Sequence, residues 1–296
     1  MDCQAASEDI VIVAPLLPEA AGEAAYSAYE IDPVVLETAT RLDEALSTAP
    51  GVSTFRRNDS AAANPTIQGL SIRASAPSGA GRALVTLDGQ PLNDPFGGWV
   101  IWGAAPPETI EGATILRGAG AGPYGAGALT GTVNLRERRG QGAVLSLEGG
   151  ERGYLRAAGV GEAENKSWSF MLAAAAQQQD GWVPVQDGRG AADAPIWSDS
   201  IAGVSRVEWR DHARVLSVRL GGYSESRGAG LVGADSKSEG ANLSIALASP
   251  AGAFAGQVHG ARRGCAAGLG DGVGSLQHVC GRRAGPQHDD TGQRTI

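Results

Sequence analysis

The sequence predicts a small α+β domain, with a mixed sheet and short helices, followed by a series of antiparallel strands. Its 296 residues include 44 glycines and only 5% aromatic residues, which favours short strands and turns over helical bundles. Short apolar segments separated by turn residues fill positions 52–135, and alternating apolar and polar positions follow from residue 141. This length suits one large domain or two ordinary ones.

Composition and charge argue against several classes of protein. The net charge of −8 argues against a nucleic-acid partner, since phosphate contacts need clustered Lys and Arg. Nowhere do about 18 apolar residues follow one another, so we expect no transmembrane helix. The first residues, MDCQAASEDI, lack a basic segment and an apolar segment, so we expect no signal peptide in this chain, either because the start was assigned too late or because the signal has been removed.

A short amphipathic helix is predicted at residues 38–48. Leu42, Ala45 and Leu46 fall on one side at helical spacing, and the Pro-Gly pair at 50–51 stops the helix. The preceding Ala-, Glu- and Pro-rich stretch is expected to be a linker with one strand at 26–31. Five further strands are predicted, at residues 52–56, 66–73, 83–87, 114–116 and 132–135.

A glycine-rich loop lies between the last two of these strands. Gly120 to Gly125 fits the G-x-G-x-x-G pattern, which binds a pyrophosphate only where a helix follows directly. The segment GTVNL that follows is instead predicted as a strand, so a nucleotide-dependent enzyme is the weaker alternative. No other enzyme signal is evident, because His212 has no nucleophile in a suitable context and nothing near Glu108 or Glu111 would shift their ionisation toward acid–base catalysis.

The second half of the chain has the alternating residue pattern of strands with one buried and one exposed face. Trp168, Phe170 and Leu172 share one face, opposite Ser169 and Met171, and the same alternation recurs further along the chain. Apolar residues outward and polar residues inward, over about ten positions, is the pattern of transmembrane β-barrel strands. A water-soluble β-sandwich shows the same alternation, so the pattern alone leaves both architectures open.

A longer stretch carries a family resemblance. Residues 82–139 contain an Asp-Gly turn, a strand ending in Leu-Arg-Gly and a glycine-rich hairpin, and LDEALSTAPGV and NPTIQGLSIR precede them. This order resembles the plug domain of TonB-dependent outer-membrane receptors, over roughly residues 36–139. The resemblance implies a transporter in the cell outer membrane, without catalysis or cofactor. The partners it implies are TonB with its inner-membrane energising complex, outer-membrane lipid and a small-molecule ligand such as a metal–siderophore complex.

The resemblance also assigns an amino-terminal segment. A short β-branched run stands ahead of a prolyl stretch, where its unpaired backbone groups could join the edge of another sheet. It looks like the family's TonB box, and the alternatives are a first strand of the plug or a segment without regular structure. The residues concerned are Glu8, Asp9, Ile10, Val11, Ile12, Val13 and Ala14.

Two arginines are predicted to fasten the plug. Arg73 and Arg117 end their strands at positions where the family keeps arginines that pair with glutamates on the inner barrel wall. A guanidinium is planar and permanently charged, so it can hold a carboxylate reversibly through two hydrogen bonds. The alternative is that both are solvated charges at strand ends.

A loop after the Asp-Gly turn joins polar and aromatic residues. By resemblance it forms part of the extracellular apex of the plug, where ligand is first held. The alternative is that its three aromatic residues cap the plug core. The candidates are Asn93, Asp94, Phe96, Trp99 and Trp102.

The predicted barrel is incomplete, and the end of the chain is unusual. Transporters of this class use about 22 strands, whereas residues 141–260 hold about seven to nine at roughly ten residues each. We divide the chain into TonB box and linker (1–35), plug (36–140), partial barrel (141–260) and an aberrant tail expected to be disordered (261–296).

The tail loses the strand alternation and looks like an out-of-frame translation or an unrelated junction. Its Cys265, Cys280, His278 and His288 fit no structural zinc spacing, so we expect no metal.

Two functions remain open. The first is a TonB-dependent receptor for a scarce nutrient, with iron–siderophore complexes as the leading ligand class. The second is a soluble periplasmic plug-like module that binds or signals without transport.

Overall fold

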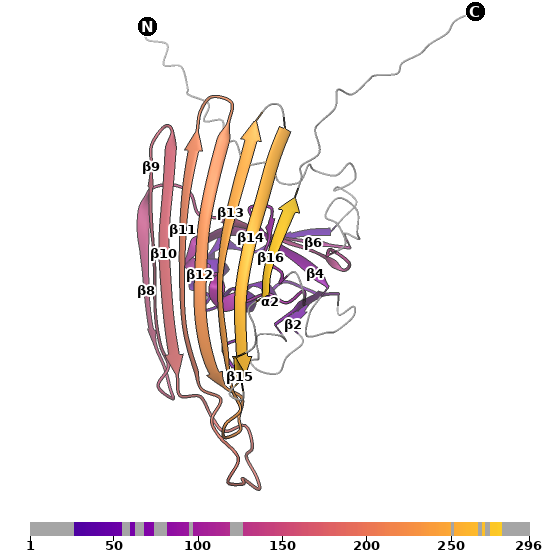
Figure 1. Cartoon of the computed structure of the whole chain (residues 1–296), viewed down its shortest axis with the longest axis vertical. Helices are drawn as coiled ribbons and strands as arrows, with labels where there is room; N and C mark the ends of the chain where they lie inside the picture. The colour runs from indigo at the N-terminus through magenta and orange to yellow at the C-terminus, as the bar shows by residue number, and fades with distance from the viewer. Residues whose placement is uncertain are drawn as a thin grey trace, which may run out of the picture.

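The computed structural model describes residues 27–54, 60–62, 68–73, 82–94, 97–118 and 127–249, and the backbone of 252–265, 268–269 and 273–279. These residues form a compact N-terminal domain and a long, curved antiparallel sheet that lies along one side of it (Figure 1). The predicted fold class, an α+β domain followed by antiparallel strands, is confirmed.

The N-terminal domain, residues 27–137, is built on a mixed sheet of five strands in the order β1-β6-β7-β4-β5. Strands β4 and β7 are parallel, and the other neighbours are antiparallel. A separate pair, β2 with β3, and two 3-10 turns complete the domain. The elements are β1 (Ser27–Glu30), β2 (Val52–Thr54), β3 (Leu70–Ile72), β4 (Ala83–Leu87), β5 (Gln90–Pro91), η3 (Trp102–Ala104), η4 (Pro107–Thr109), β6 (Ile110–Arg117) and β7 (Gly131–Glu137).

Two short helices lie between β1 and β2. Helix α2 (Leu42–Ser47) lies inside the predicted helix, and its apolar side is buried as expected. Helix α1 (Pro33–Thr38) was not predicted. Its signal is Asp32, whose carboxylate accepts a hydrogen bond from the Val34 amide at 2.9 Å, followed by a proline at the first helical position.

The core of the N-terminal domain lies between these helices and the sheet. It is entirely aliphatic apart from Trp102, and most of its members are almost inaccessible to solvent. Its largest members are Leu36, Leu42, Leu46, Leu70, Ile72, Val85, Trp102, Ile110, Ile115 and Leu135.

The predicted Asp-Gly turn joins β4 to β5. Asp88 and Gly89 both have positive φ, 48° and 78°, which is the type I′ geometry that a two-residue hairpin favours. Gly131 opens strand β7, so the segment after the glycine loop is a strand, as expected, and not a nucleotide-binding helix. Gly120 to Gly125 lie outside the described residues.

In its described part, the long sheet is a meander in which each strand from β8 to β14 pairs with the next. It is open at β8, which pairs only with β9 among the described strands. The strands are β8 (Gly142–Gly149), β9 (Leu155–Glu164), β10 (Trp168–Gln179), β11 (Ser198–Arg210), β12 (Val215–Gly228), β13 (Asp235–Ser249), β14 (Gly252–Cys265), β15 (Gly268–Leu269) and β16 (Val273–Val279).

Three of these strands, β14, β15 and β16, extend into or lie within the part of the chain that we treated as a tail. Strand β14 continues to Cys265, beyond the boundary placed at residue 260, and β16 pairs with β14. Cys280 and His288 lie outside the described residues.

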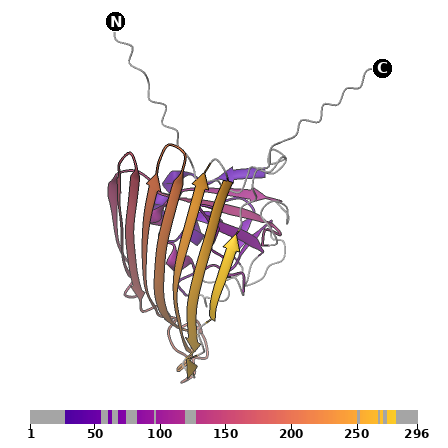
Figure 2. The same cartoon turned by 45° about the horizontal axis from the view of Figure 1, so that its top comes forward.

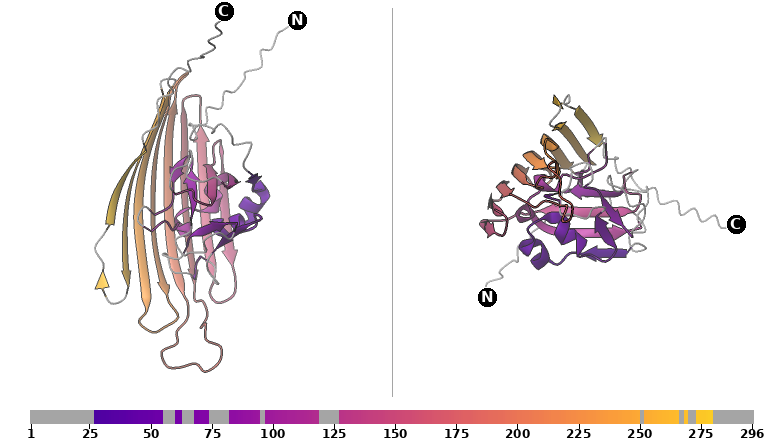
Figure 3. Two further views of the ribbon diagram at one scale, coloured as in Figure 1. Left: turned by 90° about the vertical axis from the view of Figure 1, so that its right-hand side faces the viewer. Right: turned by 90° about the horizontal axis from the view of Figure 1, so that it is seen from below.

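The two faces of the long sheet differ in chemistry, as the alternation predicted. Trp168, Phe170 and Leu172 are exposed, whereas Ser169 and Met171 are buried on the other face. The buried face is turned toward the N-terminal domain, and the views in Figures 2 and 3 show the domain in the hollow of the curved sheet. Among the described helices, none is long and apolar enough to cross a membrane.

Candidate functional site

The polar contact between the N-terminal domain and the long sheet is the candidate site. We call the face of β8–β13 that is turned toward the domain the wall. Two layers of charged residues on the wall meet charged or polar groups of the domain, and an apolar layer lies between them. In the apolar layer Ile101 packs on Ala202 and Tyr223, with Trp99 and Ala104 beside them.

The first charged layer centres on Glu137, the last residue of β7. Its carboxylate is fully buried and is held by two wall arginines. Arg206 donates from Nη1 to Oε2 at 3.0 Å, and Arg219 donates from Nε to Oε1 at 2.7 Å. Arg206 also donates from Nη2 to the backbone oxygen of Arg138 at 2.6 Å. Because Arg206 and Arg219 are register partners on β11 and β12, the two side chains leave the sheet side by side.

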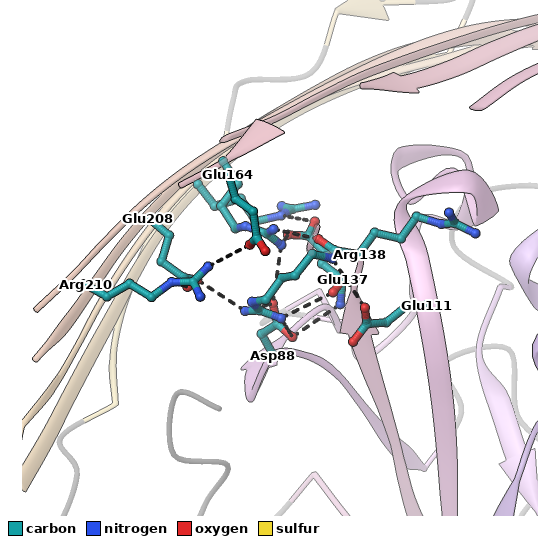
Figure 4. Close-up of polar contacts among 10 residues, drawn as sticks. Asp88, Glu111, Glu137, Arg138, Glu164, Glu208 and Arg210 are labelled. Atoms are coloured by element: carbon teal, nitrogen blue, oxygen red, sulfur yellow. Dashed lines mark hydrogen bonds and ion pairs between the residues drawn. The ribbon is translucent and has the colours of Figure 1, made fainter. Parts of the chain in front are cut away.

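The same layer contains a second bridge between domain and wall (Figure 4). Arg139 binds Asp88 at 3.0 Å and Glu208 of β11 at 3.4 Å. Burial would lower the pKa of Arg139, but the two carboxylates outweigh it and raise the pKa. Glu208 also contacts Arg210, which reaches Glu164 at 3.1 Å. Since Asp88 is the first residue of the hairpin turn, the turn geometry aims its carboxylate at the wall.

The second charged layer centres on Arg156 of β9. Its guanidinium holds Glu108 of η4 through two hydrogen bonds, 2.7 and 2.8 Å long, and Glu148 of β8 at 2.9 Å. Burial tends to raise the pKa of Glu108, but the hydrogen bonds and charge of Arg156 outweigh it, so the pKa lies below its usual value. In the loop after β8, burial and the neighbouring Glu148 raise the pKa of Tyr154 to about 12.

The two residues just before α2 add hydrogen bonds to this layer. Thr40 donates to Glu148 at 2.9 Å, and Arg41 donates to Gln177 of β10 at 2.9 Å. From the wall, Arg227 of β12 donates to the backbone oxygen of Ser60 at 3.0 Å. The domain is therefore attached through reversible polar contacts to β8, β9, β10, β11 and β12.

The predicted arginine fasteners lie elsewhere. Arg117 donates to the backbone oxygen of Pro50 at 3.1 Å and to Ser27 at 2.7 Å, and both partners belong to the domain. Arg73 has a positive φ of 62°, and its guanidinium lies against Gly118. The pairing of these arginines with barrel glutamates stays a prediction.

The predicted polar apex residues organise their own loop. Asn93 accepts a hydrogen bond from the Val85 amide at 2.7 Å and donates to two backbone oxygens of the domain. Asp94 accepts from the Gly97 amide at 2.8 Å. Phe96 and the TonB-box residues 8–14 lie outside the described residues.

The two tryptophans of the apex face inward. Trp102 is 2% exposed, belongs to the domain core, and donates from its ring nitrogen to the backbone oxygen of Gln68 at 2.9 Å. Trp99 is half-buried against the apolar layer at the wall. The position of Trp102 corresponds to the alternative in which the aromatic residues cap the plug core, whereas Trp99 packs at the wall, and ligand contact stays a prediction.

Sequence reasoning missed the residues that join the two parts. Glu108 was considered only as a catalytic acid, and its structural partner, Arg156, was not singled out. The available signal was the alternation itself, because charged residues at inward positions of a strand need partners on whatever fills the hollow. No group of three or more His, Cys, Asp or Glu side chains within the described residues could hold a metal ion.

Comparison with known proteins agrees with this architecture. Residues 23–132 match the family model described as the TonB-dependent Receptor Plug Domain. No match to a curated protein was found. Three solved structures illustrate the structural similarity. A mutant of the ferric enterobactin receptor PfeA from Pseudomonas aeruginosa is 16% identical, with a TM-score of 0.59 over 80% of this chain and 40% of that one.

The ferric citrate transporter FecA in its unliganded form is 14% identical, with a TM-score of 0.61 over 81% of this chain and 40% of that one. The copper transporter OprC is 19% identical, with a TM-score of 0.56 over 76% of this chain and 35% of that one. The chain therefore spans about 40% of the length of the structures it resembles.

These findings define a plug domain followed by open, antiparallel barrel strands. Residues 23–132 match the TonB-dependent receptor plug domain, and the long sheet has the fold of part of the barrels of these structures.

Proposed function

We propose that this chain acts in an outer-membrane receptor that imports a scarce nutrient, with the plug as its gate. The observation that carries the proposal is the reversible ionic attachment of the plug to the wall. A domain held by ion pairs and hydrogen bonds, without a covalent cross-link to the wall, can shift when it is pulled and then return. The activity is transport, and no chemical step is involved.

The outer face of the long sheet supports insertion into lipid. Leu145, Leu147, Leu172, Ile201 and Leu220 stand exposed on strands β8 to β12. Isolated exposed apolar residues are ordinary, but a continuous apolar band across neighbouring strands is expected to be covered by lipid or by another protein.

The ends of the band also suit a membrane. Trp168 and Trp209 are register partners, and they lie next to the short connections after β9 and β11. Aromatic girdles at the interface and short periplasmic turns are typical of outer-membrane barrels.

The loop lengths then orient the sheet. The connection between β10 and β11 covers residues 180–197, far longer than those on the opposite side. In barrels of this kind the long loops are extracellular. The plug would therefore meet ligand from the side of residues 180–197 and meet TonB from the side of the short turns.

Energisation is assigned to the TonB box at residues 8–14. Strand addition by this segment to TonB would transmit a pull to the plug. The test is binding of the full chain to a purified periplasmic domain of TonB. Ile10→Pro should abolish binding because proline removes a backbone donor, while Ala5→Pro, outside the box, should retain it. Equal binding by both variants would contradict the assignment.

An iron–siderophore complex is the ligand class we propose. Two of the similar structures carry ferric enterobactin and ferric citrate in their names, although a copper transporter has the same fold. Titration of the full chain with ferric and iron-free siderophores, with cobalamin as a comparison, tests this class through tryptophan fluorescence. Saturable quenching by a ferric siderophore is expected; quenching by cobalamin alone would refute the class.

A soluble periplasmic module is the second candidate, since the sheet is open at β8 in its described part. Such a module would bind TonB or ligand without conducting anything. Flotation of the purified full chain with vesicles of phosphatidylethanolamine and phosphatidylglycerol separates the two. The receptor should float with the vesicles and resist carbonate extraction, and the soluble module should stay at the bottom of the gradient.

A further inference from the structure

The plug is attached to the wall at one end of its sheet. Strands β6 and β7 are antiparallel, and their register pairs Ile110 with Glu137 at one end and Arg117 with Gly131 at the other. Glu137 reaches the wall, whereas the contacts of Arg117 stay within the plug. At about 3.3 Å per residue, these two charged groups are separated by roughly 20 Å along the ladder.

We propose that Glu137, clamped by Arg206 and Arg219, is the positioning residue that fixes this end of the plug sheet on the wall. The inference rests on the proposed function, in which the plug must be held and yet be movable. It assigns the attachment to a carboxylate of the plug and arginines of the wall, the reverse of the polarity predicted for Arg73 and Arg117.

Burial makes the Glu137 clamp the strongest candidate among the contacts. The Glu137 side chain has no exposed surface, and the side chains of Arg206 and Arg219 are 1% and 12% exposed. By contrast, Glu37 binds Arg138 at 3.2 Å with its side chain 59% exposed. A buried ion pair that loses one partner leaves an unpaired charge without water, whereas an exposed pair is worth little.

The clamp also controls the connector between plug and barrel. Residues 138–141 link β7 to β8 directly. The backbone oxygen of Arg138 accepts from Arg206, and its amide donates to the Thr109 oxygen at 2.8 Å. A protease needs an extended, unpaired backbone, so cleavage after Arg138 or Arg139 requires this end of the sheet to leave the wall.

Limited trypsin digestion of the full chain in detergent tests the proposal, with mass spectrometry of peptides that end at Arg138 and Arg139. Glu137→Gln and Arg206→Gln should speed this cleavage by about 100-fold. Loss of one partner of a buried pair costs about 3–5 kcal/mol, and each 1.4 kcal/mol is about tenfold. Glu37→Gln is the exposed control, because Glu37 of α1 pairs with Arg138 of the same connector, and this variant should cut within about twofold of the unsubstituted chain.

Arg206→Gln and one further variant, Arg219→Gln, keep the test decisive. Arg206→Gln leaves the sequence around the cleaved bond unchanged, but it removes a direct contact with Arg138. Arg219→Gln removes a partner of Glu137 and a hydrogen bond to Asn242 on the neighbouring strand, but no contact with the connector, so faster cleavage in this variant reports the clamp itself. Should Glu137→Gln prevent folding, Arg219→Gln still tests the idea, because Arg206 continues to pair with Glu137.

The double variant Glu137→Gln, Arg206→Gln should cut more slowly than the product of the single effects predicts, because neither Glu137 nor Arg206 is then left charged without the other, and Arg219 is the one clamp charge that has lost its partner. Equal cleavage rates in the Glu137, Arg206 and Arg219 variants and the Glu37 control would overturn the proposal. The result is independent of lipid and ligand, so failure of vesicle insertion would affect the proposed function and leave the clamp standing.

Discussion

Substitution of Glu108 by glutamine should loosen the second charged layer by a measurable amount. The Glu108 and Arg156 side chains are 8% and 4% exposed, and two hydrogen bonds of 2.7 and 2.8 Å join them. Breaking a buried pair costs about 3–5 kcal/mol when the remaining charge is stranded. Here Glu148 still holds Arg156 at 2.9 Å, so we expect the lower figure of roughly 2–3 kcal/mol, in the range of one hydrogen bond to a charged group.

Hydrogen exchange of the full chain in detergent measures this effect. Amides of β9 near Arg156 should exchange faster in the Glu108→Gln variant, by the factor that corresponds to the lost free energy. Glu111→Gln is the matched control, because its pair with Arg136 is 3.9 Å long and both side chains are about 40% exposed. If the two variants exchange alike, within about 0.5 kcal/mol, the ion pair does not hold the plug and our reasoning on burial fails.

Three other outcomes follow from the same structure. The pKa of Glu108 is lowered in the folded state. Its ionised carboxylate therefore stabilises the fold fully above the unfolded pKa of about 4.3, and this contribution disappears as pH falls through the folded pKa. The difference in β9 exchange rate between the natural chain and Glu108→Gln should shrink below about pH 4, and a constant difference would contradict this. Leu172→Arg, in the middle of the outer face, should reduce vesicle flotation, at a cost of about 2–4 kcal/mol, whereas Gln178→Arg near the end of the same strand should float normally. Gly131→Ala should destabilise the plug by about 1–3 kcal/mol in urea titrations, because φ is 150° and the new methyl would meet a backbone oxygen of β6; Gly149→Ala, where nothing lies within 4 Å, should behave as the natural chain does.

Local patterns predicted the elements whose signals are contained in a few residues. Strand β4 occupies the predicted residues, and the hairpin at Asp88 has the predicted turn. Helix α1 was missed because its apolar residues, Val34 to Leu36, are consecutive and show no helical spacing, so only the cap at Asp32 marks it. The alternation of Trp168 with Ser169 likewise predicted the two faces of the long sheet.

Long-range partners could not be predicted in the same way. Glu137 and Arg206 are 69 positions apart, and their contact depends on how the plug sits against β11. The alternation predicts that Arg206 faces inward, but it does not predict which plug residue contacts it. Trp102 shows a related limit, since an aromatic residue in a loop has the same sequence signature whether its ring packs in the core or faces a ligand.

The register of β6 and β7 shows which end of the plug sheet lies at the wall. With a carboxylate at the wall end of the ladder and Arg117 at the other, the plug sheet presents opposite charges at its two ends. If the plug were reversed, Arg117 would face Arg206 and Arg219 across a buried contact, and like charges without water repel strongly. The wall arginines therefore disfavour the reversed placement, which the short connector of residues 138–141 also opposes, and they add a specificity that apolar packing of Ile101 on Ala202 could not supply alone.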